Sequence, residues 1–120
     1  MASDKDALNA GLAEALAPVL GEEAVYDIQA DRIIPVDDRN STLIYSRVSK
    51  DFTDPAVLWP LWERWDIDHD WTVTIYRKPV DGFEATVWQD KPGYYRKGAS
   101  TTEAVARAWH AALMGVPADA

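Results

Sequence analysis

The fold is decided by residues 71–89, WTVTIYRKPVDGFEATVWQ. Apolar or aromatic residues alternate with polar ones on both sides of a central turn, and this period of two is typical of β-strands. The turn contains Pro79, which fixes φ, and Gly82, which accepts positive φ, so the two strands are predicted to form an antiparallel hairpin. One face of the hairpin would be apolar and would comprise Trp71, Val73, Ile75, Phe83, Ala85 and Val87. Helices elsewhere in the chain are expected to cover this face, because an apolar sheet face must be removed from water.

Helices are predicted near residues 4–17, 54–65 and 100–114, where apolar residues recur at helical spacing. Asp54 and Pro55 are typical of a helix start, since Asp caps the first turn and Pro is tolerated at the first helical position. A capping box, Ser100-Thr101-Thr102-Glu103, opens the last helix. This last helix is predicted to lie across the apolar face of the hairpin.

The segment between residues 22 and 50 contains three short β-prone runs, at 25–28, 33–36 and 43–48. The run at 43–48 is the best strand candidate among them. Pro35 would have to lie on an edge or outside a ladder, because it cannot donate a backbone hydrogen bond. One or two extra strands or an ordered loop are expected here.

Composition limits the class of protein. With 120 residues, 48% of them apolar, the chain is long enough to bury a core, and we predict a single α+β domain over residues 1–120. The chain has no cysteine, which excludes disulfides, thiol catalysis and cysteine-ligated zinc. Neither a signal peptide nor a run of about 20 apolar residues is present, so a soluble cytoplasmic protein without membrane association is expected.

Charge is unevenly distributed along the chain. The formal net charge is −8, and residues 1–70 hold fifteen acidic and six basic side chains, whereas residues 71–120 are close to neutral. An acidic front half argues against direct binding to a phosphate backbone. It would suit a basic protein surface or mimicry of nucleic acid, and solubility alone is the other explanation.

One cluster, residues 66–70 (DIDHD), has residue types that bind metals or transfer protons. It fails as a calcium-binding EF-hand loop, because Trp71 and Arg77 stand where Gly and Glu are required. A looser cation site is the alternative to an acidic turn between a helix and a strand. No serine elbow, oxyanion loop or glycine-rich phosphate loop accompanies His69 or His110, so we expect no catalytic residue, no metal and no cofactor, and predict that the protein is not an enzyme.

The second half of the chain, residues 52–114, resembles small phage proteins that carry the phage ABA sandwich domain. The resemblance is carried by Asp54-Pro55 opening a helix that ends at Trp65, by the two hairpin strands, and by the segment at 100–108, STTEAVARA. It implies a phage or prophage origin and a sheet between helices. It implies no chemistry and no binding residues, and the strand-like segment at 22–50 departs from it.

Together these features lead to the hypothesis of a small phage-encoded binding protein that inhibits a bacterial defence complex, as anti-CRISPR proteins do, in the cytoplasm of the host cell. The partner would be a host protein, contacted through an acidic surface. The candidate partner-binding residues are Asp37, Asp38, Trp59, Asp66, Asp68 and Asp70.

Two alternatives come from other features of the chain. The first is weak nucleic-acid binding, in which aromatic residues stack on bases and basic residues meet phosphates. It would use Arg77, Lys78, Tyr94, Tyr95, Arg96 and Lys97. The second is a structural or homodimeric protein in which Trp59 or the polar face of the hairpin makes the contact.

Overall fold

The computed structural model describes residues 4–78, 82–89 and 93–116. Its elements, in chain order, are α1 (Asp4–Leu20), α2 (Glu22–Val25), β1 (Tyr26–Pro35), β2 (Ser41–Ser49), α3 (Pro55–His69), β3 (Thr72–Lys78), β4 (Gly82–Trp88), β5 (Tyr94–Gly98) and α4 (Thr101–Met114). The strands form two antiparallel sheets, β1-β2 and β3-β4-β5. The predicted α+β class is therefore confirmed.

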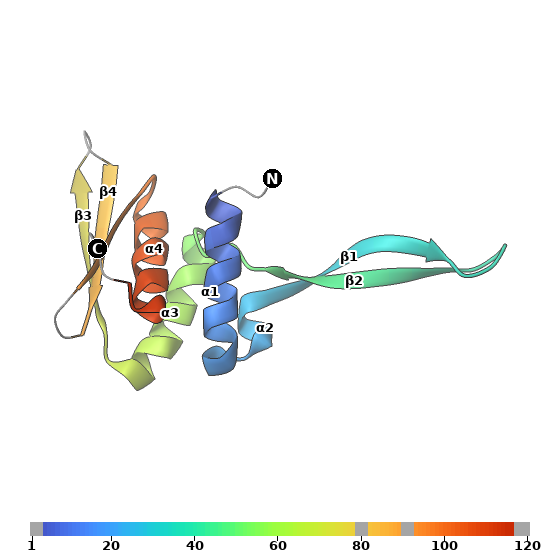
Figure 1. Ribbon diagram of the computed structural model, residues 1–120, viewed down its shortest axis with the longest axis horizontal. Coiled ribbons are helices and arrows are strands. Elements are labelled where there is room, and N and C mark those ends of the chain that lie inside the picture. Colours follow the sequence, from blue (N-terminus) through green and yellow to red (C-terminus); the bar gives the residue numbers. More distant parts are fainter. Residues whose placement is uncertain (1–3, 79–81, 90–92, 117–120) are drawn as a thin grey trace.

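The predicted hairpin is the pair β3 and β4, in which Val73 lies opposite Val87 and Ile75 opposite Ala85. Its turn residue Pro79 lies outside the described residues, whereas Gly82 begins β4 with a φ of +92°. The segment after the hairpin forms the third strand, β5. As Figure 1 shows, α4 lies against this sheet, as predicted. All six residues of the predicted apolar face belong to the core or pack against it.

Tryptophan rings fill the space between the helices and the sheet. Trp109 of α4 is completely buried, and the ring of Trp62 in α3 meets it edge-on at a centroid distance of 5.3 Å. The centre of the Trp65 ring lies 5.6 Å from the centres of both the Trp109 and the Trp71 rings. Aromatic side chains bury large areas, so this cluster dominates the packing of α3 and α4 on the sheet.

The helix ends follow from local chemistry. The Asp54 side chain accepts a hydrogen bond from the Ala56 amide, and the Ser100 side chain accepts one from the Glu103 amide. The carboxylate of Glu103 in turn accepts from the Ala99 amide, which completes the predicted capping box. Two helices run beyond their predicted ends: α3 continues to His69, before Asp70 takes a left-handed conformation with a φ of 54°.

The other extended helix is α1, which includes Pro18 and ends at Leu20. Proline removes one backbone donor, but the last turn still closes through a 2.9 Å bond from the Gly21 amide to the Ala17 carbonyl. The apolar side of α1 packs on α4 and α3 through Leu8, Leu12 and Leu16, so the first helix also belongs to the core.

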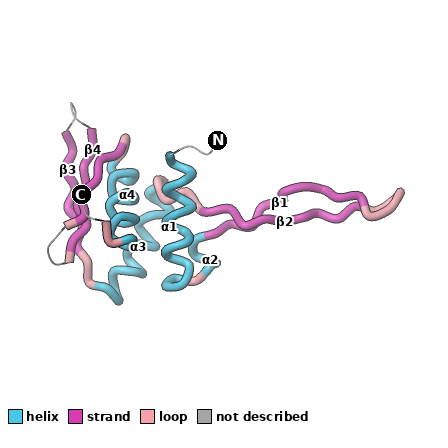
Figure 2. Tube along the Cα trace, viewed as in Figure 1, coloured by secondary structure: helices cyan, strands magenta, loops and turns pink. Residues whose placement is uncertain are grey.

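The pair β1 and β2 forms a long ribbon that projects away from the remaining elements (Figures 1 and 2). The molecule measures 61 × 34 × 27 Å and has a radius of gyration of 17.3 Å. A compact domain of this length would have a radius of about 14 Å. We call residues 26–49 the arm and the other described residues the body. The sequence predicted strands here, but it did not predict that they would leave the body.

Candidate protein-binding arm

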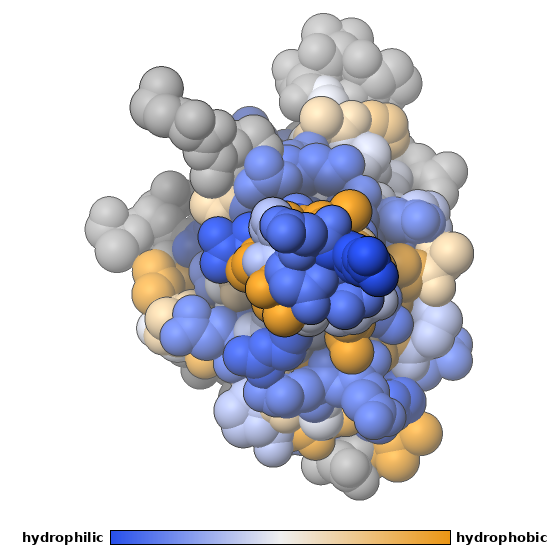
Figure 3. All heavy atoms as spheres, turned by 90° about the vertical axis from the view of Figure 1, so that its right-hand side faces the viewer, coloured by the Kyte–Doolittle hydropathy of each residue, from blue (hydrophilic) through white to orange (hydrophobic). Residues whose placement is uncertain are grey.

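Large apolar side chains on the arm face solvent. The exposed fractions are 75% for Ile28, 65% for Ile33, 58% for Tyr45 and 46% for Leu43. In Figure 3, which views the molecule with the arm pointing at the reader, hydrophobic residues are interspersed with hydrophilic ones on this side of the molecule. Contiguous exposed apolar surface on a small protein marks an interaction site more often than it serves the fold.

The strand register places these four residues on one side of the ribbon. Ile28 lies opposite Arg47, Ala30 opposite Tyr45, and Ile33 opposite Leu43. Because residues directly opposite each other in an antiparallel pair project from the same face, all of these side chains share a face. We call this the apolar face of the arm; its members are Tyr26, Ile28, Ala30, Ile33, Pro35, Ser41, Leu43, Tyr45, Arg47 and Ser49. The opposite face is mixed, with Asp27, Gln29, Arg32, Ile34, Thr42, Ile44, Ser46 and Val48.

A β-bulge is responsible for this segregation. The register shifts between Ala30 and Arg32, so that Asp31 has no partner of its own in β2. If Asp31 instead paired with β2 and the whole of β1 alternated strictly, Ile33 would turn to the mixed face and Arg32 to the apolar one. The bulge therefore keeps a charged residue off the apolar face and adds an isoleucine to it.

The base of the arm is fixed to the body. The Lys50 amide donates to the Val25 carbonyl at 2.9 Å, and Val25 itself is completely buried. Arg47 forms an ion pair with Glu22 and lies 4.8 Å from the centre of the Tyr26 ring. The one charged residue of the apolar face is thus engaged at the base, and the apolar face carries no charge between Arg47 and the tip.

At the tip, Asp37 builds the turn. Its carboxylate accepts hydrogen bonds from the backbone amides of Arg39 and Asn40, both at 2.8 Å, and from the Asn40 side chain at 3.1 Å. These bonds hold the pKa of Asp37 below its usual value, and the bond from the Arg39 amide has the largest effect. Asp38 is exposed beside it. The tip therefore carries two aspartates and Arg39, a net charge of −1, and Asp37 is already used by the chain itself.

The other candidate residues lie in α3 or directly after it, in the body and away from the tip of the arm (Figure 1). The Asp66 carboxylate accepts the Trp71 amide at 2.6 Å and links the end of α3 to the sheet. Asp70 is exposed, Trp59 is half-buried against the core, and the side chain of Asp68 lies outside the described residues. The structure thus brings Asp37 and Asp38 together, and separately Asp66 and Asp70, but it does not unite the two groups in one patch.

The basic and aromatic run in β5 is divided by strand alternation. Tyr94 and Arg96 lie opposite Val87 and Ala85 on the core side, whereas Tyr95 and Lys97 project from the other face. Tyr94 is also engaged within the fold, with its ring 5.9 Å from that of Trp71. The side chains of Arg77 and Lys78 lie outside the described residues. The described members of the proposed nucleic-acid set therefore do not share one surface.

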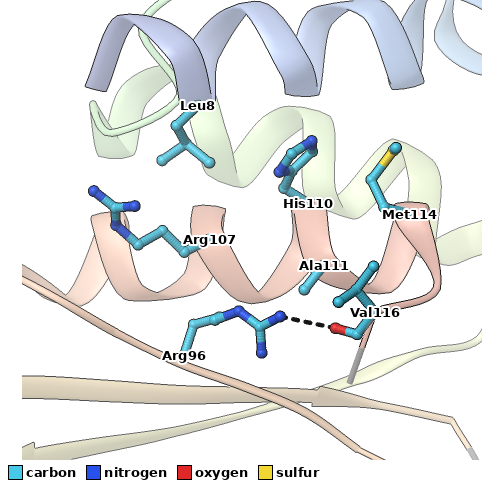
Figure 4. Close-up of a pocket in the computed structure, with 7 residues that line it drawn as sticks. All are labelled: Leu8, Arg96, Arg107, His110, Ala111, Met114 and Val116. Atoms are coloured by element: carbon cyan, nitrogen blue, oxygen red, sulfur yellow. Dashed lines mark hydrogen bonds between the residues drawn. The ribbon is translucent and has the colours of Figure 1, made fainter. Parts of the chain in front are cut away.

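A pocket of about 380 Å³ lies between α1, α4 and β5, with Arg96, Arg107 and His110 on its walls (Figure 4). Arg96 donates to the carbonyls of Tyr95 and Val116 at 2.7 and 2.8 Å, and Arg107 bonds the Glu103 carboxylate at 2.9 Å. Burial, with a smaller effect of Arg96, lowers the pKa of His110. Because both arginines already have partners, the pocket is a weaker candidate for a ligand site than the arm.

No group of three His, Asp or Glu side chains that could hold a metal ion occurs in the part of the chain that the structure describes. Within the same ranges, no helix is long and apolar enough to span a membrane. His69 is used locally: its ring stacks on that of Trp65 at 4.7 Å, and its Nδ1 lies 2.7 Å from the Trp65 carbonyl oxygen.

Sequence reasoning missed the apolar face of the arm. The signal in the sequence was weak, because a bulge interrupts the alternation in β1 and because a β-prone run does not reveal whether anything covers it. A search of family models, of curated proteins and of solved structures finds no match to this chain.

Proposed function

We propose that this chain is a non-catalytic protein-binding module that docks the apolar face of its arm on a partner protein. The observation that carries the proposal is the exposure of Ile28, Ile33, Leu43 and Tyr45 on one face of a ribbon that projects from the body. Covering apolar surface releases about 25 cal/mol per Å², and these four side chains are all large. An isolated two-stranded ribbon is only marginally stable in water, so a partner would also stabilise the arm itself.

The charged tip supports a protein partner rather than a membrane. Insertion of the arm into a bilayer would bring Asp37, Asp38 and Arg39 to the lipid first, and taking these charges out of water is costly. A protein groove with a basic end would accept both the apolar face and the tip.

Affinity capture with two matched variants tests the proposal. Ile33→Lys places a charge on the apolar face, and Gln29→Lys places the same charge on the mixed face of the same strand. Captured proteins are identified by mass spectrometry, and the binding of the purified candidate is then measured with each variant. We expect the first variant to lose the partner and the second to keep it. Equal binding by both variants would contradict docking through the apolar face.

A finer proposal, that the protein inhibits a bacterial defence complex in the cytoplasm of a phage host, is supported by the resemblance and by the charge. The arm contains four Asp and three Arg, so −7 of the net charge of −8 belongs to the rest of the chain. In this version the body presents its acidic surface to a basic nucleic-acid channel after the arm has docked. One variant reverses the charges of Asp66 and Asp70, and a second variant reverses the charge of Asp38. Comparison of their inhibition would identify which surface contributes. Unchanged inhibition in all variants would exclude electrostatic mimicry.

A further inference from the structure

The two edges of the arm differ in their ability to accept another strand. In the described part of the chain the arm is a two-stranded sheet, so each strand has one edge without a neighbouring strand. β1 is interrupted by the bulge at Asp31 and ends at Pro35, which has no N–H group. Both features hinder the pairing of a further strand with the edge of β1. β2 runs from Ser41 to Ser49 without proline, glycine or a bulge. It is the edge at which another strand can be added.

We propose that β2 pairs antiparallel with β2 of a second copy of this chain, giving a four-stranded sheet in the order β1-β2-β2-β1. The composition of β2 suits self-pairing, because Arg47 is its sole charged residue and no acidic side chain interrupts it. Four strands with a common apolar face are also more stable than an isolated ribbon of two.

Symmetry fixes the register of this pairing. Opposite residues project to the same side, so the apolar faces of both copies coincide when the two-fold axis is perpendicular to the sheet and runs midway between the two copies of one residue. Overlap along the whole of β2 places that axis at Tyr45, the central residue of Ser41–Ser49. Tyr45 then lies opposite its own counterpart, and Leu43 lies opposite the partner's Arg47. The two arginines do not face each other, so the interface contains no direct like-charge pair.

The separation of the two acidic bodies supports this arrangement. Antiparallel arms point in opposite directions, so the bodies lie at the two ends of the shared sheet, and the tip of each arm, with Asp37, Asp38 and Arg39, lies beside the base of the other arm. Nine residues of strand span about 30 Å, well beyond the Debye length of about 8 Å at physiological ionic strength. The arms themselves carry a net charge of only −1 each. Because the β1 edge is blunted, the assembly closes at two copies instead of growing into a fibre.

This inference goes beyond docking on a partner protein and does not depend on it. Edge pairing uses the backbone of β2, whereas partner docking uses the apolar face, and the dimer would present both apolar faces on one side of a single sheet. Its test requires only the purified chain, so either proposal can fail while the other stands.

Sedimentation equilibrium over a concentration series tests the pairing. The wild-type chain should approach a mass of twice 13.4 kDa as its concentration rises. Tyr45→Glu and Tyr45→Lys each place two like charges opposite each other on the axis and should weaken dimerisation at least about tenfold. An equimolar mixture of the two variants should recover the dimer, since a carboxylate then faces an ammonium group. Loss of apolar area alone would not give this recovery.

Ile28→Lys is the matched control, because Ile28 lies on the same apolar face but on β1, away from the axis. It should leave the dimer intact. Circular dichroism verifies that each variant keeps its fold, and Tyr45 is exposed enough for substitution without loss of core packing. A wild-type monomer at every concentration, a mixture that stays monomeric, or a dimer unaffected by both Tyr45 variants would overturn the pairing. Dissociation by Ile28→Lys as strong as by Tyr45→Lys would overturn it too, in favour of face-to-face packing.

Discussion

Gly98 of β5 lies directly against the backbone of Ala104 in α4, so closely that a methyl group at Gly98 would lie 2.5 Å from the Ala104 amide nitrogen. Real Cβ atoms do not approach backbone this closely, and here the neighbouring atoms belong to a helix that cannot rearrange like a flexible side chain. The absence of a side chain at position 98 is what lets α4 pack on the sheet at this distance.

Gly98→Ala should therefore destabilise the protein by about 3 kcal/mol, the upper part of the usual range for overpacking. Thermal or urea unfolding followed by tryptophan fluorescence measures the effect, because the tryptophan cluster lies between α4 and the sheet. Ala99→Ser is the control, since Ala99 is exposed and a surface substitution changes stability by about 0.5 kcal/mol at most. A similar loss of stability in both variants would argue against the close approach of Gly98 to Ala104 as its cause.

The parts of the fold that the sequence predicted are those specified by local patterns. Strict alternation specified the hairpin face that contains Val73 and Val87. Residues within a few positions of each other specified the Asp54 cap and the capping box at Ser100. Each of these was found where the pattern placed it. The longer ends of α1 and α3 show that Pro18 and the aspartates after Trp65 mark helix ends only to within a few residues.

Long-range relations escaped prediction. Glu84 belongs to the polar positions of the alternating hairpin pattern, yet its exposed fraction is 6%. It lies between Tyr76 and Lys97 in neighbouring strands, and the Lys97 Nζ lies 3.8 Å from its carboxylate. The arm was missed for a similar reason, since no local pattern states that the pair β1 and β2 will leave the body. Of the candidate site residues, Asp37 and Asp66 proved to be bonded within the chain itself, which is a structural use that a charge pattern cannot reveal.

Asp51, in the connection from β2 to α3, should make stability depend on acid pH. Partial burial disfavours its charged form, but hydrogen bonds from Thr53 and Lys5, with a weaker one from Asn9, outweigh that effect and lower the pKa of Asp51 to about 2. Because this pKa is depressed in the folded state, the contribution of the Asp51 carboxylate to the free energy of unfolding is complete above about pH 4 and is lost as the pH falls towards about 2. Asp51→Asn should cost about 1 kcal/mol at neutral pH, a modest figure because the carboxylate is partly solvated.

The measurement is the free energy of unfolding of the wild-type chain and of Asp51→Asn at several pH values. The difference between the two should shrink as the pH falls below about 4 and vanish near pH 1. Parallel curves would show that Asp51 stabilises the fold through its shape and not through its charge. Thr53→Val, which removes the closest donor at 2.6 Å, should give an intermediate curve.

The bulge in the arm can be tested by deletion. Removal of Asp31 leaves the pairs formed by Ile33 with Leu43 and by Ala30 with Tyr45 unchanged, because Asp31 is the unpaired residue. The apolar face should therefore survive, and binding of a captured partner should change by less than about threefold, which corresponds to less than 1 kcal/mol. Removal of Ser46 from β2 is the counterpart, because it moves Tyr45 and Leu43 out of register with β1 and should abolish binding. Equal effects of the two deletions would contradict the assigned faces.

Excision of the arm should separate folding from binding. Asp27 and Val48 lie opposite each other at its base, so residues 28–47 can be replaced by Asn-Gly, which forms a two-residue hairpin turn. No residue of the excised segment belongs to the buried core, whose nearest members are Val25 and Phe52. The ion pair between Arg47 and Glu22 is exposed to solvent, so its loss should change the melting temperature little. The shortened chain should keep its tryptophan fluorescence, and without β2 it should be monomeric and should no longer bind the partner. Collapse of the fold would show instead that the arm stabilises the body, and a shortened chain that still binds the partner would move the binding site to the body.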